Sequence, residues 1–146
     1  MQIVDARPED AGALAQILGD WLRELAWMPI LHSRDEDLAF VSRMIASHRV
    51  RVARDDRGRA LGFIAVRQCV IGGFYVAAGA RGQGIGKALL EDAKAVEPRL
   101  TLLTFQDNLG AIAFYTREGF VETERSNGAC NEEGLPDLRM IWRRAE

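Results

Sequence analysis

Apolar residues recur at two different spacings, and these spacings divide the chain into helices and strands. Residues 8–25 repeat apolar side chains with the helical period, and a proline with two acidic residues in the first turn favours a helix start. Pro29 interrupts this pattern in the bend 27–32. Ser33 and Glu36 have the spacing of a capping box, which predicts that a second helix begins at this point.

Strand patterns fill most of the remaining chain. The segments 50–54 and 60–66 flank a turn, which predicts a hairpin. Leu100–Phe105 is mostly apolar, which predicts a strand buried on both faces. Further strands are expected at 2–7, 69–77, 120–124 and 138–142, with helices at 86–96 and between Asn108 and Gly119.

The expected order is one strand, two helices, three strands, a helix, a strand, a helix and two strands. Strands alternate with helices only in the middle of the chain, so we expect an α/β fold with a mixed (α+β) sheet rather than a doubly wound parallel sheet. The chain has 146 residues and shows no repeat or low-complexity segment. We therefore predict a single domain over residues 1–146.

Charge and cysteine content exclude several classes of protein. The net charge of −2 gives no basic signal for nucleic acid, and no apolar run approaches the ~20 residues of a membrane helix. Cys69 and Cys130 form no Cys-x-x-Cys pair, and neither His32 nor His48 has ligand spacing to them, so we expect no metal. Two cysteines without a disulfide scaffold, and a start without an apolar signal segment, predict a cytoplasmic protein.

A glycine-rich turn joins the strand at 69–77 to the helix at 86–96, with the sequence Arg81-Gly82-Gln83-Gly84-Ile85-Gly86. Glycine lets the backbone turn tightly and approach a ligand, and a helix start presents unpaired N–H groups to an anion. The turn therefore predicts a pyrophosphate cradle.

Two common nucleotide motifs do not fit this turn. A Gly-x-Gly-x-x-Gly fingerprint fails in both registers, because its last position falls on Lys87 or Leu89. A P-loop fails because Arg81 takes the first glycine position and Ala88 takes the Ser/Thr position. No hydroxyl is thus available there for Mg²⁺.

The spacing Arg81-x-x-Gly84-x-Gly86 resembles the coenzyme A pyrophosphate loop of GNAT-type N-acetyltransferases. A second stretch, 108–120, resembles the same superfamily, with Ala111, Phe114 and Tyr115 on one helical face. The resemblance implies the GNAT fold: a central mixed, mostly antiparallel twisted sheet of about seven strands flanked by four helices. It also implies that the strands ending near Val76 and Phe105 splay apart to admit the pantetheine arm.

The resemblance implies acetyl-coenzyme A as cosubstrate and no metal. The residues that it places against coenzyme A are Phe74, Tyr75, Val76, Arg81, Gly82, Gln83, Gly84, Ile85, Gly86, Lys87, Asn108, Ala111, Phe114 and Tyr115.

Acetyl transfer to an amine needs a fixed thioester, a stabilised carbonyl oxygen, a base and a proton for the thiolate. A backbone N–H near Val76 could bind the carbonyl, and Gly72 with Gly73 is compatible with either a bulge or merely a weakened strand. Tyr115 could protonate the thiolate, because a tyrosine pKa of about 10 lies near that of an alkyl thiol. A core tyrosine fits the same helix.

The base and the acceptor contacts are expected in two loops. Glu132 and Glu133 enter the last strand and could face a cationic amine, although an acidic surface loop is the plainer interpretation. His32 could act as the base, and Trp27 could bind the amine beside it, although a loop histidine next to a core tryptophan has the same pattern. The candidate catalytic residues are therefore Tyr115, Glu132, Glu133 and His32.

These features predict an N-acetyltransferase that moves the acetyl group of acetyl-coenzyme A directly to a primary amine of a small molecule, in a ternary complex. The alternatives are acetylation of a protein N-terminus or lysine, and a non-catalytic acyl-coenzyme A sensor. The expected partner is a small-molecule amine acceptor. We expect the protein to bind neither nucleic acid nor a membrane, and the chain could form a homodimer. The sequence does not identify the acceptor.

Overall fold

The computed structural model describes residues 1–145 and contains the predicted elements in the predicted order. The helices are α1 (Ala11–Glu24), α2 (Arg34–Ser47), α3 (Ile85–Val96) and α4 (Leu109–Arg117). The strands are β1 (Gln2–Asp5), β2 (Arg49–Arg54), β3 (Ala60–Arg67), β4 (Val70–Val76), β5 (Arg99–Phe105), β6 (Val121–Ser126) and β7 (Asp137–Arg143). Short 3₁₀ turns occupy Pro8–Asp10 and Ala78–Ala80.

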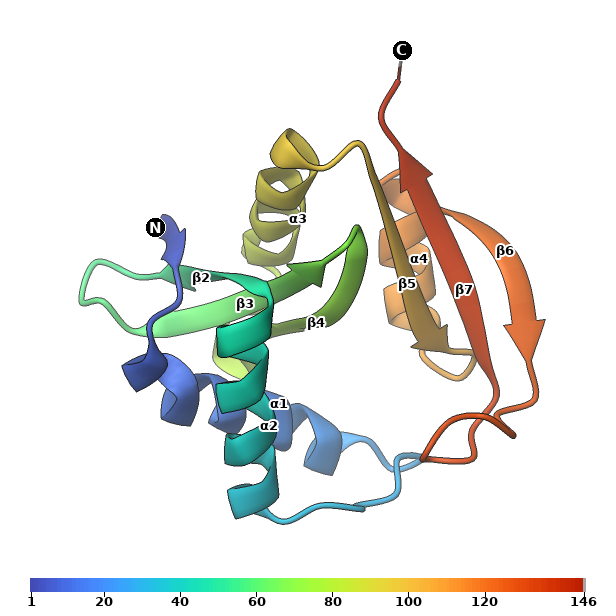
Figure 1. Cartoon of the computed structure of the whole chain (residues 1–146), viewed down its shortest axis with the longest axis horizontal. Coiled ribbons are helices and arrows are strands. Elements are labelled where there is room, and N and C mark those ends of the chain that lie inside the picture. Colours follow the sequence, from blue (N-terminus) through green and yellow to red (C-terminus); the bar gives the residue numbers. More distant parts are fainter. Residues whose placement is uncertain (146) are drawn as a thin grey trace.

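The strands form one mixed sheet in the order β1-β2-β3-β4-β5-β7-β6. Neighbouring strands run antiparallel except β4 and β5, which are parallel and pair only at Val70 and Thr101. Beyond this pair the two strands diverge toward Val76 and Phe105, as Figure 1 shows. The predicted splay is therefore confirmed, and it leaves the facing edges of both strands without ladder partners.

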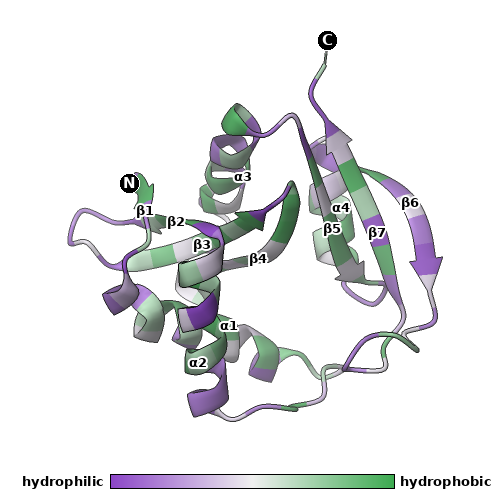
Figure 2. Cartoon of the chain, in the orientation of Figure 1, coloured by the Kyte–Doolittle hydropathy of each residue, from purple (hydrophilic) through white to green (hydrophobic). Residues whose placement is uncertain are grey.

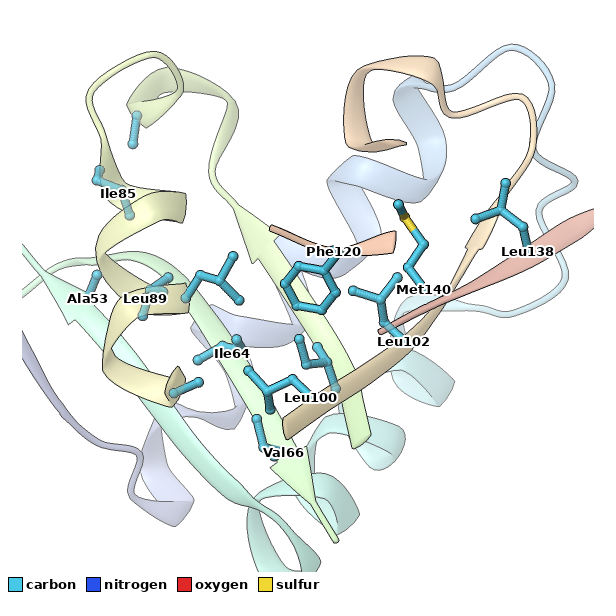
Figure 3. Packing of buried hydrophobic residues seen from close by; sticks show 14 residues of the cluster. Ala53, Ile64, Val66, Ile85, Leu89, Leu100, Leu102, Phe120, Leu138 and Met140 are labelled. Carbon is cyan, nitrogen blue, oxygen red and sulfur yellow. The ribbon is translucent and has the colours of Figure 1, made fainter. Parts of the chain in front are cut away.

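Helices cover both faces of the sheet because the inner strands are apolar on both sides. Phe63 packs toward α1 and α2, whereas Ile64 packs toward α3. The buried residues thus form two clusters, one on each face of the sheet. Figure 3 shows Ile64, Leu100 and Phe120 in the cluster on the α3 side. Figure 2 shows hydrophobic and hydrophilic residues alternating around α1 and α3, as expected for helices with one buried face.

Strand β5 differs from its prediction, because it is buried on one face only. Leu100 and Leu102 are buried, but the side chain of Leu103 is 58% exposed. The buried cluster under α1 and α2, which covers this face of β2 and β3, contains no residue of β5, so Leu103 lines a cavity instead of packing in the core. An apolar run alone could not reveal this, because it has the same composition in both situations.

Gly72 and Gly73 in β4 form a β-bulge, which was one of the two structures that the sequence allowed at this pair. Ala65 pairs with Gly73 and Val66 pairs with Ile71, which leaves Gly72 as an extra residue opposite β3. The bulge bends β4 close to the point where it leaves β5. Among the described residues, no helix is long and apolar enough to cross a membrane.

Candidate functional site

A cavity of about 700 Å³ occupies the space where β4 and β5 separate. Its walls come from α1, β4, β5 and α4, together with residues of the glycine-rich turn and the β6–β7 loop. The predicted site residues that line it are Phe74, Tyr75, Val76, Arg81, Gly86, Asn108, Ala111, Phe114, Tyr115 and Glu133. The structure therefore gathers residues from across the sequence at one place.

The other predicted coenzyme A residues belong to the outer part of the turn. Gly82, Gln83, Gly84 and Lys87 are exposed, whereas the Ile85 side chain is buried in the core. Gly82 and Gly84 have φ values of 75° and 80°, in the left-handed region that favours glycine. These glycines shape the turn at the mouth of the cavity and do not line its interior.

Helix α3 begins with Gly84 as its N-cap, and no side chain caps it. The hydrogen-bond ladder starts with the N–H of Ala88, which donates to the Gly84 carbonyl at 3.0 Å. The preceding N–H groups of the first turn have no partner within the helix, and they lie at the positive end of its dipole. These N–H donors fit a pyrophosphate. Because Gly86 has no side chain, such a ligand can come close to the backbone of the first turn.

Arg81 connects the turn to α1. Its Nη2 lies 2.5 Å from Oε1 of Glu24, the last residue of that helix, and both side chains line the cavity. Both are also partly exposed, so water weakens this ion pair. The contact nevertheless fixes the turn next to the end of α1.

Tyr115 projects from α4 into an aromatic cluster at the cavity wall. Asn108 caps this helix by accepting a hydrogen bond from the Ala111 N–H at 3.2 Å, as the sequence predicted. The ring centroids of Phe74, Phe114 and Phe120 lie 6.2, 5.5 and 5.4 Å from that of Tyr115.

Burial among these rings raises the pKa of Tyr115 well above its usual value of 10.0. This corrects the expected balance with an alkyl thiol. The hydroxyl keeps its proton throughout the physiological range, and it gives that proton up less readily than an exposed tyrosine would.

Another part of the cavity wall combines aromatic rings with a carboxylate. Trp21 and Tyr75 have ring centroids 5.2 Å apart, and Glu133 reaches the cavity from the β6–β7 loop. Burial and, to a smaller degree, the charge of Glu133 raise the pKa of Tyr75 to about 12. Trp27 does not line the cavity itself, but it packs edge-on against Phe105, which does.

His32 and Glu132 lie outside this cavity and pair with each other. Nε2 of His32 contacts Oε1 of Glu132, and its Nδ1 lies 3.4 Å from Oε2 of Glu36. The Glu36 contact and then the Glu132 charge raise the pKa of His32 above its usual 6.5. Both ring nitrogens face carboxylates, and His32 does not line the large cavity, so the geometry disfavours the role of base that the sequence suggested for His32.

Several cavity residues were missed as site residues because they looked like ordinary core. The helical period of α1 assigned Trp21, Leu22 and Leu25 to a buried face, and Met28 follows in the bend. All four line the cavity, as does Glu24. The available signal was their position, since they occupy the last turn of α1 and the bend that was already suspected of bordering the acceptor.

Comparisons with known proteins agree with this geometry. Residues 46–122, more than half of the chain, match the family described as acetyltransferase (GNAT) domain. A curated relative, the peptidyl-lysine N-acetyltransferase YjaB of Salmonella typhimurium, is 34% identical over 91 residues. That match covers 62% of this chain and 63% of the relative, so it spans less than two thirds of the relative's length.

Two solved structures show the same fold along nearly the whole chain. The apo form of YjaB from Escherichia coli has a TM-score of 0.78 at 24% identity and covers 99% of this chain and 98% of its own. A phosphinothricin acetyltransferase from Sinorhizobium meliloti, in complex with AcCoA, has a TM-score of 0.76 at 20% identity. This match covers 99% of the present chain and 89% of the phosphinothricin acetyltransferase chain. These likenesses show the fold, and the match over residues 46–122 identifies the chain as a member of the GNAT acetyltransferase family.

Proposed function

We propose that the protein transfers the acetyl group of acetyl-coenzyme A directly to a primary amine held in the same cavity. The observation that carries this proposal is the cavity itself, which joins Gly86 at the start of α3 to Tyr115 and Glu133. An anion site, a proton donor and a carboxylate thus share one space. Acyl transfer to an amine requires these groups together, because both reactants must be held in one orientation.

The cosubstrate is assigned to the wall formed by the turn, β4 and α4. The unpaired N–H groups of the first turn of α3 would bind the pyrophosphate. The edge of β4 that faces away from β3 has no ladder partner near Val76, so a backbone N–H is available for the thioester carbonyl. Tyr115 would then protonate the departing thiolate. The family match and the AcCoA complex of one structural neighbour support this assignment.

The acceptor is assigned to the end of the cavity that holds Glu133 and the rings of Trp21 and Tyr75. A carboxylate pairs with an ammonium group, and aromatic faces attract the same cation. Glu133 would first bind the ammonium form and then take its proton, directly or through one water. Because only the free amine attacks the thioester, the rate should rise with pH as a larger fraction of the amine loses its proton.

Two acceptors carry this chemistry. A small primary amine fits the cavity, and it is the acceptor that we propose first. The side chain of a lysine within a protein ends in the same kind of amine. The YjaB relative is named a peptidyl-lysine N-acetyltransferase, which favours this second candidate. We also propose a cytoplasmic location, where the free thiols of Cys69 and Cys130 would stay reduced.

Steady-state thiol release from acetyl-coenzyme A tests the acceptor assignment. The panel should contain small primary amines and a lysine-containing peptide with a blocked N-terminus. Changing Glu133→Gln should raise KM for the accepted amine about tenfold and leave coenzyme A affinity intact, because only the acceptor loses an ionic partner.

The matched control is Glu91→Gln, on an exposed position of α3. Unchanged kinetics in Glu133→Gln would remove this residue from the acceptor site. Turnover of the peptide with a lower KM than any small amine would select the protein acceptor. Binding of acetyl-coenzyme A without turnover of any amine would favour the sensor.

A further inference from the structure

The β6–β7 loop, residues 127–136, carries Glu133 to the cavity, and a histidine from another part of the chain contacts the neighbouring residue of this loop. We propose that His32 is a positioning residue, which binds Glu132 and thereby fixes Glu133 at the acceptor end of the cavity. The proposal rests on the function assigned above to Glu133. It replaces the role of base that the sequence suggested for His32 with a structural role in the same reaction.

The first support for this role is the way Glu36 is held. Ser33 caps α2 by accepting a hydrogen bond from the Glu36 N–H at 3.2 Å, and the Ser33 N–H donates to Oε1 of Glu36 at 3.0 Å. Oε2 of the same carboxylate faces Nδ1 of His32 at 3.4 Å. The capping box therefore fixes the carboxylate that orients the imidazole ring.

The main chain of His32 is fixed as well. Nη2 of Arg23 donates to the His32 carbonyl at 3.0 Å, and Nη1 of the same guanidinium donates to Asp37 at 3.1 Å. Asp37 is only 4% exposed and lies on α2, whereas Arg23 lies on α1. The bend that carries His32 is thus attached to both helices, so the ring is presented from a rigid support.

Hydrogen bonds within the loop close it around Asn131, and His32 adds a contact from another part of the chain. Nδ2 of Asn131 donates to the Leu135 carbonyl at 2.6 Å and to Asp137 at 3.2 Å, which closes the base of the loop. The ion pair with His32 connects the side chain of Glu132 to the bend between α1 and α2. Figure 1 shows the segment between α1 and α2 meeting the segment between β6 and β7 at this place.

Glu133 is the residue that transmits this contact to the site. It lines the large cavity and also a neighbouring one of about 40 Å³, whose wall includes His32. Gly134, with a φ of 67°, closes the turn that contains Glu132 and Glu133, because its N–H donates to the Asn131 carbonyl at 3.3 Å. A shift of Glu132 after loss of the His32 contact would therefore carry Glu133 with it.

The contact depends on the charge of His32, and so it depends on pH. Glu36 faces the ring from α2, Glu132 contacts it from the loop, Glu133 shares the small cavity, and Arg23 approaches the carbonyl from α1. The carboxylates raise the pKa of His32 above 6.5, with Glu36 the largest favourable cause. The attraction is therefore complete below about pH 6.5 and is lost as pH rises through the higher value in the folded protein.

The pH profile of kcat/KM for the amine tests the proposal. The wild-type profile should flatten as His32 becomes neutral and then continue to rise until the alkylamine itself has lost its proton, at pH ~10. His32→Gln should raise KM for the amine roughly two- to fivefold near neutral pH, the effect of losing one exposed ion pair, and should remove the step in the profile. His32→Lys, which keeps the positive charge, should retain a low KM and move the step toward pH ~10.

Further variants and two further measurements complete the experiment. Glu132→Gln should reproduce the effect of His32→Gln, and the double variant should add nothing further. His48→Gln changes the other histidine of the chain and should leave the step in place. Coenzyme A affinity should be the same in all of these variants. An NMR titration should show the Glu133 amide signal following the ionisation of His32 in the wild type but not in His32→Gln.

A His32→Gln variant with wild-type KM, an unchanged pH profile and an unchanged Glu133 titration would overturn the proposal. If Glu133→Gln raises KM while His32→Gln does not, the positioning role fails and the proposed function stands. If Glu133→Gln itself leaves the kinetics unchanged, the proposed function of Glu133 fails, whatever His32 does.

Discussion

Tyr115 shows how its surroundings change the chemistry of a single residue. The motif brought a hydroxyl to the cavity, but the neighbouring rings raise its pKa above the usual 10.0. A tyrosine that stays protonated is always ready to donate, and it produces no step of its own in a pH profile below its raised pKa. Its part in the reaction is therefore best tested by removing the hydroxyl.

Replacing Tyr115→Phe keeps the aromatic packing and deletes only the proton donor. If Tyr115 protonates the thiolate, kcat should fall by about 10²–10⁴-fold, with little change in coenzyme A affinity. Steady-state measurement of thiol release gives kcat, and calorimetry gives the affinity for coenzyme A. A variant that turns over at the wild-type rate would leave Tyr115 as a packing residue, with water as the proton source.

At the scale of elements, α3 and the turn before it carry the cofactor assignment. Gly84 and Gly86 differ as sites for mutation, because Gly84 has a φ of 80° and any side chain there strains the backbone. A Cβ at Gly86 would lie 3.7 Å from Phe114 and from Val76, which is ordinary contact. Gly86 therefore gives the cleaner test.

Gly86→Val should leave the domain folded but weaken coenzyme A binding at least tenfold, because the added methyl groups occupy the approach to the first turn of α3. Calorimetry measures the affinity, and circular dichroism checks the fold. Gly79→Val is a matched control, since nothing lies within 4 Å of its Cβ position. Chelation of Mg²⁺ should not change the affinity, because Ala88 offers no hydroxyl to the metal. Wild-type affinity in a folded Gly86→Val variant would refute the cradle.

Local signals predicted the elements well, because each is contained in a few neighbouring residues. The capping box at Ser33 and Glu36, and the cap at Asn108, formed as their spacing predicted. Leu103 was assigned wrongly because its exposure depends on how far α1 and α2 extend over the sheet, which no local pattern reports. The pairing of His32 with Glu132 joins residues a hundred positions apart, and it was invisible for the same reason.

At the scale of the whole molecule, the splay between β4 and β5 gives the fold its site. The sheet is continuous through Val70 and Thr101 and opens beyond them, so one structure provides both a core and a cavity. The splay followed from the family resemblance rather than from any residue in β4 or β5. The acceptor end also needs α1, the bend and the β6–β7 loop to meet, and the sequence identified only the bend and the loop as candidates.

Transfer of a labelled acetyl group shows directly whether the protein acetylates an amine. The protein should be incubated with acetyl-coenzyme A labelled in the acetyl carbons and with a primary amine, and the label should be followed by mass spectrometry. We predict that the label appears on the amine nitrogen in proportion to the thiol released, and that Gly86→Val lowers both signals together at an acetyl-coenzyme A concentration below saturation. Folded protein that binds acetyl-coenzyme A but moves no label to any small amine or lysine peptide would contradict the account.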